Sequence, residues 1–212
     1  MNIRSIHELQ DYIDEEFSWR LKEISDLKNT VQVAEPLRED TLIRASVPLL
    51  YAHWEGFIKS SSEAYLNYIG NKNLKYNELK PCFVVHGFKK RIHEISNSNQ
   101  TKKNIEITKF ILDELDQKAT LSYKGLIDTK SNLNSKVFEN IASSIGIDTN
   151  NYETKYNLID ESLLKRRNKI AHGNYVDLMA NDLINLCDKV ISLLRQYKTD
   201  IENSSALRDY KK

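Results

Sequence analysis

The chain has 212 residues, of which 40% are hydrophobic and 29% are charged, and its formal net charge is +1. This length suffices for one large hydrophobic core, and the balance of apolar and charged residues excludes a fully disordered chain. Because the chain has 31 basic and 30 acidic residues, the molecule as a whole would attract nucleic acid only weakly. Any contact with RNA must therefore come from a local patch.

Only six glycines and three prolines occur in the chain. An all-β protein with a turn about every 8–12 residues would need more turn-forming residues, so composition favours long helices. No run of about 18 apolar residues occurs, and the N-terminal residues contain no apolar segment of signal-peptide length. We therefore expect an all-α protein of the cytoplasm, with no membrane span. Cys82 and Cys187 are isolated, so we expect no zinc site, no structural disulfide and no cofactor.

Two long helices are expected in the first third of the chain. Apolar residues recur every three or four positions over residues 6–31, which predicts an amphipathic helix, and Ser5 followed by Glu8 resembles a capping box. A second helix is predicted over residues 36–70, because proline fits the first turn of a helix and glycine its C-terminal end.

Pro48 lies inside this second pattern, where it removes a backbone hydrogen bond and should kink or divide the helix. Large apolar side chains follow it on one helical face. We expect this piece to be the central core helix, with these residues in the core: Leu50, Trp54, Phe57 and Ile58.

The middle of the chain is less regular. Residues 82–95 and 104–115 are predicted helices, separated by a polar loop, and residues 135–145 form a short helix. Residues 118–134 form a turn-rich connection, which is either mobile or packs over a site. The pattern leaves both alternatives open.

The last third is predicted to contain two further helices. One runs over residues 159–171 and is stopped by Gly173 and Asn174, and the other spans residues 177–202 with a four-three alternation of apolar residues. We expect one domain over residues 1–202 and a charged, frayed tail over residues 203–212.

Arg167 and His172 are the residues best suited to chemistry. Histidine, with an ordinary pKa of about 6.5, both takes and gives a proton near neutral pH, and arginine offers a planar fork that matches phosphate oxygens. Together they suit cleavage of RNA by its own 2′-hydroxyl, a reaction that needs no metal ion. We therefore expect no metal at this site.

The spacing of this pair raises a geometric problem. Five residues along a regular helix place the side chains of Arg167 and His172 about 140° apart. Either the helix loosens toward Gly173, or a second copy of the chain completes the site. The spacing alone also fits a solvated pair without catalytic function, and Lys165 with Arg166 also fits an ordinary charged helix face.

Glu55 lies on the predicted core helix, close to Tyr51 and His53. A buried carboxylate costs several kcal/mol unless it is paired, so an inward-facing Glu55 would need a cation, for which Arg167 is a candidate. The alternative is a carboxylate at the solvated end of an amphipathic stripe.

Two separated segments resemble one known family. The segment Arg167-Asn168-Lys169-Ile170-Ala171-His172 resembles the R-x4-6-H signature of HEPN domains (higher eukaryotes and prokaryotes nucleotide-binding). Residues 49–59 resemble the first core helix of the RiboL-PSP-HEPN-like prokaryotic branch, and residues 159–164 fit the same branch. The resemblance covers residues 40–70 and 157–195.

This resemblance implies an antiparallel helical bundle with a kinked central helix, here with extra helices between residues 76 and 145. It implies a homodimer in which Arg and His of both subunits line one cleft. Active members are metal-independent endoribonucleases that leave a 2′,3′-cyclic phosphate, and they act as toxins of toxin–antitoxin pairs or as phage-defence effectors. A separate antitoxin or a second HEPN protein is therefore an expected partner besides RNA.

By position, the resemblance implies that Arg167 binds and stabilises the scissile phosphate and that His172 transfers a proton. It implies that Asn168 orients the phosphate or the histidine. Supporting or substrate-binding residues are expected to be the following: Glu55, Lys165, Arg166, Lys169 and Tyr51. Other HEPN proteins have lost cleavage, so the alternative is a module that binds RNA, a nucleotide or a protein, or that neutralises another HEPN chain. Nothing in the sequence selects among transfer, messenger and ribosomal RNA.

Overall fold

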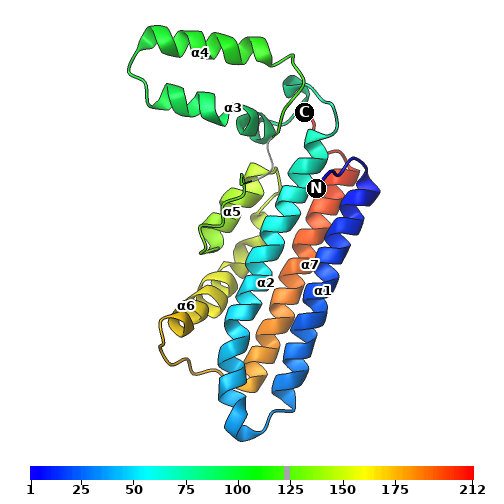
Figure 1. Ribbon diagram of the computed structural model, residues 1–212, viewed down its shortest axis with the longest axis vertical. Coiled ribbons are helices and arrows are strands. Elements are labelled where there is room, and N and C mark those ends of the chain that lie inside the picture. Colours follow the sequence, from blue (N-terminus) through cyan, green and yellow to red (C-terminus); the bar gives the residue numbers. More distant parts are fainter. Residues whose placement is uncertain (122–124) are drawn as a thin grey trace.

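A computed structural model describes residues 1–121 and 125–212 (Figure 1). Over these two ranges the chain is helical and contains no strand, which confirms the all-α class. None of the described helices combines the length and the apolar character that a membrane span requires.

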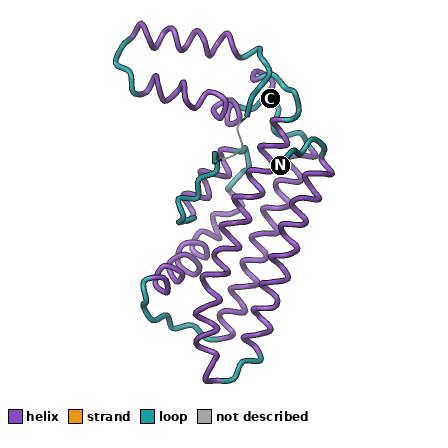
Figure 2. Tube along the Cα trace, in the orientation of Figure 1, coloured by secondary structure: helices purple, strands orange, loops and turns teal. Residues whose placement is uncertain are grey.

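Three long helices form the main bundle: α1 (Ile6–Gln32), α2 (Pro36–Gly70) and α7 (Ala180–Ala206). Each packs along the other two (Figures 1 and 2). α1 is antiparallel to both partners, whereas α2 and α7 run in the same direction. The expected antiparallel arrangement thus holds for α1 only, because the segment between α2 and α7 carries the chain back to the end of the bundle where α2 begins.

The start of α1 has the capping box that the sequence predicts. The Ser5 hydroxyl accepts a hydrogen bond from the Glu8 amide at 3.1 Å, and the Glu8 carboxylate accepts one from the Ser5 amide at 3.0 Å. Donation by the backbone amides of Arg4 and Ser5 holds the pKa of Glu8 below its ordinary value. The helix therefore begins where its own side chains satisfy the free amides.

α2 has the predicted bounds, and it continues through Pro48 without division. An internal proline costs about 3 kcal/mol, but full burial of a valine or leucine side chain contributes about 1.5–3 kcal/mol. Val47 and Leu50, on either side of Pro48, are both fully buried. Their burial in the bundle offsets the hydrogen bond that proline removes.

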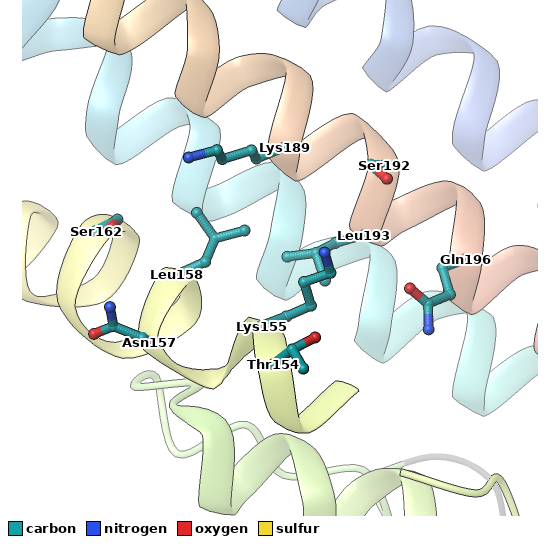
Figure 3. Close-up of a pocket in the computed structure, with 9 residues that line it drawn as sticks. All are labelled: Thr154, Lys155, Asn157, Leu158, Ser162, Lys189, Ser192, Leu193 and Gln196. Atoms are coloured by element: carbon teal, nitrogen blue, oxygen red, sulfur yellow. The ribbon is translucent and has the colours of Figure 1, made fainter. Parts of the chain in front are cut away.

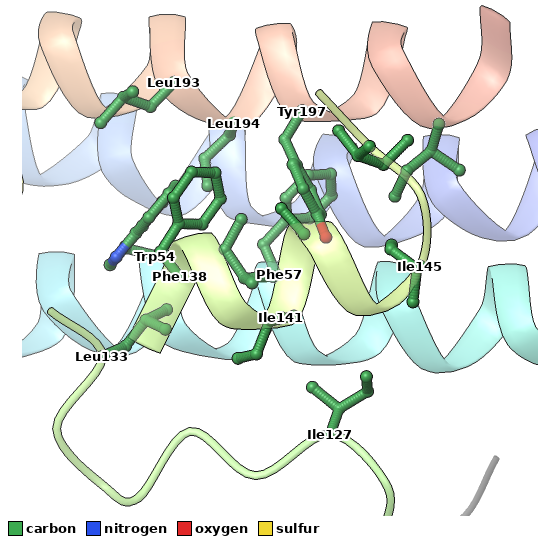
Figure 4. Close-up of a cluster of buried hydrophobic side chains, with 14 of the residues drawn as sticks. Trp54, Phe57, Ile127, Leu133, Phe138, Ile141, Ile145, Leu193, Leu194 and Tyr197 are labelled. Carbon is green, nitrogen blue, oxygen red and sulfur yellow. The ribbon is translucent and has the colours of Figure 1, made fainter. Parts of the chain in front are cut away.

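The core lies where α5 (Ser135–Ser144) packs onto α2 and α7 (Figure 4). Phe138 is at its centre, with ring centroids 5.2 Å from Trp54, 5.7 Å from Tyr197 and 4.9 Å from Tyr152. All four residues predicted for the core face of α2 are fully buried: Leu50, Trp54, Phe57 and Ile58. The central position of α2 is thereby confirmed.

A helical hairpin projects beyond one end of the bundle (Figure 1). It consists of α3 (Pro81–Ser96) and α4 (Thr101–Glu114), preceded by the short η1 (Tyr76–Glu78). Both helices lie where the sequence predicts them, within three residues at each end.

The predicted helix over residues 159–171 consists of two parts. A 3₁₀ segment, η2 (Asn150–Lys155), leads into the π-helical η3 (Leu158–Lys165), which passes directly into α6 (Arg166–Ala171). η3 buries Ile159, Leu163 and Leu164, so its packing selects the wider helix. The apolar spacing alone does not distinguish a π-helix from an α-helix.

The expectation of a frayed tail is wrong. α7 continues to Ala206, and the Tyr210 side chain beyond it is buried against the Tyr68 ring, with the centroids 6.1 Å apart. The Lys80 amide donates to the Tyr210 carbonyl at 3.0 Å. Although most residues of this segment are charged or polar, Tyr210 is aromatic, and burial of its ring orders the tail.

Candidate functional site

α6 ends in the turn that the sequence predicts. Gly173 has a φ of +76°, a left-handed conformation that glycine adopts at little cost. The Asn174 amide donates to the Lys169 carbonyl at 2.9 Å, and the Arg44 side chain of α2 donates to the Asn174 carbonyl at 2.8 Å. The end of α6 is thus fixed to the bundle.

Arg167 is half-buried between α6 and α2. Its guanidinium lies over the Tyr51 ring, with Cζ 4.2 Å from the ring centroid. Nη1 donates to the Asn168 side-chain oxygen at 2.8 Å, and Nη2 donates to the Ser131 carbonyl at 2.8 Å. The fold therefore brings three of the expected site residues together, and among the described residues N–H groups on Nη1 and Nη2 of the guanidinium donate to Asn168 and Ser131.

The connection before α5 packs over this arginine. The Leu133 amide donates to the Tyr51 hydroxyl at 2.6 Å, and the Asn168 side-chain amide donates to the Asn132 side-chain oxygen at 3.3 Å. Leu133 and Ile127 anchor the segment in the core (Figure 4). Of the two alternatives for residues 118–134, the described residues 125–134 follow the second and cover the site. Residues 122–124 lie outside the described part.

Tyr51 is a neutral support for Arg167. Burial raises the pKa of its hydroxyl, the Glu55 carboxylate raises it further, and the Leu133 amide and Arg167 oppose the shift. The phenol therefore stays protonated at neutral pH. Among the described residues, no ion pair joins Glu55 to Arg167. The Arg167 guanidinium instead lies over Tyr51, which precedes Glu55 by about one helical turn on α2.

His172 follows the last residue of α6. Its backbone amide donates to the Asn168 carbonyl at 3.0 Å, and its φ of −90° and ψ of 12° are those of a C-cap residue outside the helix. Five positions of a regular helix would place its side chain about 140° from that of Arg167, so on that geometry the two side chains would not share one face. The imidazole is exposed and makes no hydrogen bond or ion pair within residues 1–121 and 125–212.

A basic groove of about 520 Å³ lies between the end of η3, α6 and the segment that follows Gly173. Its lining residues are Glu161, Ser162, Lys165, Arg166, Lys169, Tyr175, Val176 and Asp177. Lys165 forms an ion pair with Glu161, whereas Arg166 and Lys169 have no carboxylate partner in the described ranges. Since seven residues make almost two full turns, a regular helix would place His172 within about 20° of Lys165 around its axis.

Tyr175 is the residue of this groove that sequence reasoning missed. Its side chain is 72% exposed. A large aromatic residue directly after a glycine turn, beside three basic residues, was the available signal. An exposed ring of this kind offers a stacking surface for a nucleic-acid base.

Within the described residues, no group of three or more histidine, cysteine, aspartate or glutamate side chains is arranged to hold a metal ion.

A family model described as RiboL-PSP-HEPN matches residues 15–203. The match contains most of α1, all of α2, all of α6 and most of α7, and therefore every candidate residue described above. No curated protein and no solved structure gives a significant match to the chain.

Proposed function

Because the chain belongs to the RiboL-PSP-HEPN family, we propose that it is a metal-independent endoribonuclease whose site combines Arg167 and His172. The observation that carries the proposal is the state of Arg167. Tyr51, Asn168 and the Ser131 carbonyl fix its guanidinium, and a guanidinium has five N–H donors, more than the two hydrogen bonds to Asn168 and Ser131 use among the described residues. A cation held in this way needs little reorganisation when negative charge develops beside it.

In the proposed reaction His172 removes the proton from a ribose 2′-hydroxyl. The 2′-oxygen forms a bond to the adjacent phosphorus, and the bond from phosphorus to the 5′-oxygen breaks. The leaving 5′-oxygen takes a proton from solvent water, and His172 returns its proton to solvent, which leaves a 5′-hydroxyl and a 2′,3′-cyclic phosphate. Arg167 stabilises the charge on the non-bridging phosphate oxygens, and Asn168 orients Arg167 through the 2.8 Å hydrogen bond.

A second copy of the chain supplies the missing geometry. Because five positions of a regular helix would place Arg167 and His172 of one chain about 140° apart, we infer that Arg167 of one subunit works with His172 of the other. A homodimer with two-fold symmetry contains two such composite sites. The exposure of His172, without a partner in its own described chain, supports this arrangement.

The basic groove is the proposed approach for RNA. Among the described residues Arg166 and Lys169 form no ion pair, although Glu161 and Asp177 also line the groove, and Tyr175 offers an exposed ring. Phosphate contacts from Arg166 and Lys169 and stacking on Tyr175 would hold a single strand in the groove. This local patch compensates for the near-zero net charge of the molecule.

For the biological role we propose a toxin of a toxin–antitoxin pair or a phage-defence effector, with a separately encoded antitoxin or second HEPN protein as partner. The family membership supports this role. Co-expression with the products of neighbouring genes, followed by purification and a cleavage assay, tests for a chain that binds the protein and inhibits it.

The central experiment is incubation of the purified protein with total RNA in excess EDTA, with the product ends mapped. We expect cleavage with 2′,3′-cyclic phosphate ends, and a loss of about 10²-fold or more in Arg167→Ala and in His172→Ala. Exposed residues of the same types provide matched controls, Arg38→Ala and His7→Ala. Retained cleavage in both site variants would refute the proposal.

A mixing experiment tests the composite site. When Arg167→Ala and His172→Ala chains form mixed dimers, each heterodimer regains one intact pair, so about a quarter of the parental activity should return at equal proportions. If the pair acts within one chain, the mixture stays inactive. RNA binding that weakens with salt, without any product from the parent, would instead indicate the non-catalytic binding module.

A further inference from the structure

A second cavity, of about 330 Å³, lies between the η2–η3 segment and α7 (Figure 3). It lies where the 3₁₀ segment η2 gives way to the π-helical η3, opposite residues 189–196 of α7. The residues that line it are Thr154, Lys155, Asn157, Leu158, Ser162, Lys189, Ser192, Leu193 and Gln196. A cavity of this size holds a small ligand or one nucleotide unit of a chain.

The charge of this lining is entirely positive. Lys155 stands at the end of η2 and Lys189 on α7, and both side chains line the cavity. No carboxylate lines the cavity, and neither lysine has an ion-pair partner within the described ranges. Four other lysines do pair with carboxylates: Lys28, Lys80, Lys165 and Lys198. Two unpaired ammonium groups on one small cavity repel each other, and a bound anion would relieve that repulsion.

The remaining lining fits a phosphate ester rather than a simple halide. Hydroxyl groups of Thr154, Ser162 and Ser192 can donate to phosphate oxygens. Leu158 and Leu193 supply an apolar wall that a sugar or base can contact. Figure 3 shows Leu158 pointing toward α7, between the two lysines.

We propose that this cavity is a phosphate-binding subsite, in which the ammonium groups of Lys155 and Lys189 bind phosphate oxygens. Its position favours the backbone of RNA as the source, an assignment that rests on the function proposed above. Ser162 lines both this cavity and the basic groove, so the two are adjacent along η3. A strand that leaves the groove can pass Ser162 and place its next phosphates at the lysine pair. A small phosphate ester is the other source of the same chemistry.

The test is direct binding, measured with protein carrying His172→Ala so that RNA is not consumed. A fluorescent single-stranded oligoribonucleotide is titrated by anisotropy at several salt concentrations. In the Lys155→Ala/Lys189→Ala variant, affinity should fall about tenfold or more, and the slope of log K against log salt should flatten by about two. The charge-matched control is Lys102→Ala/Lys103→Ala, on exposed and unpaired residues of α4.

A second arm identifies the source of the phosphate. AMP is titrated alone and as a competitor of the oligoribonucleotide. RNA binding that depends on the lysine pair, with no competition from AMP, assigns the cavity to the RNA path. AMP binding that the double variant loses assigns it to a small phosphate ester.

Equal binding of both probes by the lysine-pair variant and by the control would overturn the proposal. Because both lysines are exposed and unpaired, the melting temperature should not change, and Lys155→Arg/Lys189→Arg should restore affinity. The readout is binding, so a parent protein that fails to cleave RNA would contradict the nuclease proposal without affecting this result.

Discussion

The two sides of α6 differ in nearly every physical respect. On one side Arg167 and Asn168 are covered by residues 125–134 and supported by Tyr51, with hydrogen bonds of 2.6–3.3 Å. On the other side Arg166, Lys169 and Tyr175 line an open groove, and the His172 side chain nearby in the chain is exposed. A six-residue helix thus presents one enclosed and one open surface, because successive side chains turn by about 100°.

The proposed site needs a fixed cation and a solvent-accessible proton acceptor, and the two sides of α6 provide these separately. The enclosed side fixes a cation through the core, so changes there should affect stability as well as activity. The open side offers a proton acceptor and binding groups to solvent, so changes there should affect RNA and leave the fold intact. Each prediction below either sharpens this contrast or would break it.

The largest expected effect is on the enclosed side. Leu133→Ala should lower the free energy of unfolding by about 2–5 kcal/mol, because Leu133 is fully buried beneath the segment that covers Arg167. Chemical denaturation measures the loss. Tyr175→Ala on the open side should change stability by less than about 0.5 kcal/mol. Similar losses for both variants would break the contrast.

Tyr51→Phe should cost about 1–3 kcal/mol, because the ring under Arg167 is kept but the buried Leu133 amide loses its acceptor. Denaturation of this variant beside Tyr175→Phe provides the comparison, since the Tyr175 hydroxyl is in solvent. A stability equal to that of the parent would show that the amide finds another acceptor.

On the open side, Arg166→Ala and Lys169→Ala should each weaken RNA binding several-fold and flatten its salt dependence by about one unit of slope. Stability should stay within about 0.5 kcal/mol of the parent. Lys165→Ala should have a smaller effect on binding, because Glu161 already pairs with that lysine. Anisotropy titrations in 50–200 mM salt, a range over which phosphate contacts weaken strongly, distinguish these outcomes.

The smallest expected effect concerns pH. His53 lies two residues after Tyr51 on α2, and its side chain is 2% exposed. Burial lowers its pKa, and the Glu23 carboxylate at 3.0 Å only partly opposes the shift. The unfolded chain then binds a proton near pH 6.5 and the folded chain only at lower pH, so acidification below about pH 6.5 should reduce stability.

Denaturation curves at pH 7 and pH 5 measure this loss, and His53→Gln should make it smaller. His172→Gln is the matched control on the open side, and its pH dependence should follow the parent. A loss of stability that is unchanged in His53→Gln would assign the acid sensitivity to other groups.

The sequence by itself determined the long helices and the position of the candidate site. Pro36 and Gly70 predicted the bounds of α2, and other local signals predicted the capping box at Ser5 and the glycine turn at Gly173. Each of these features depends on residues that are close together in the sequence, within about one or two helical turns, so a local pattern is enough to predict it. The same locality made the Arg167 to His172 segment recognisable.

Only the tertiary structure decided what surrounds that segment. Leu133 and Ser131 reach Tyr51 and Arg167 across 82 and 36 positions of the chain, and Tyr210 orders the tail by packing on α2. The π-helical η3 and the cavity beside it likewise depend on how that segment packs against α7. Such contacts arise from the meeting of distant elements, where burial and hydrogen bonding outweigh local preference, and no local pattern encodes them.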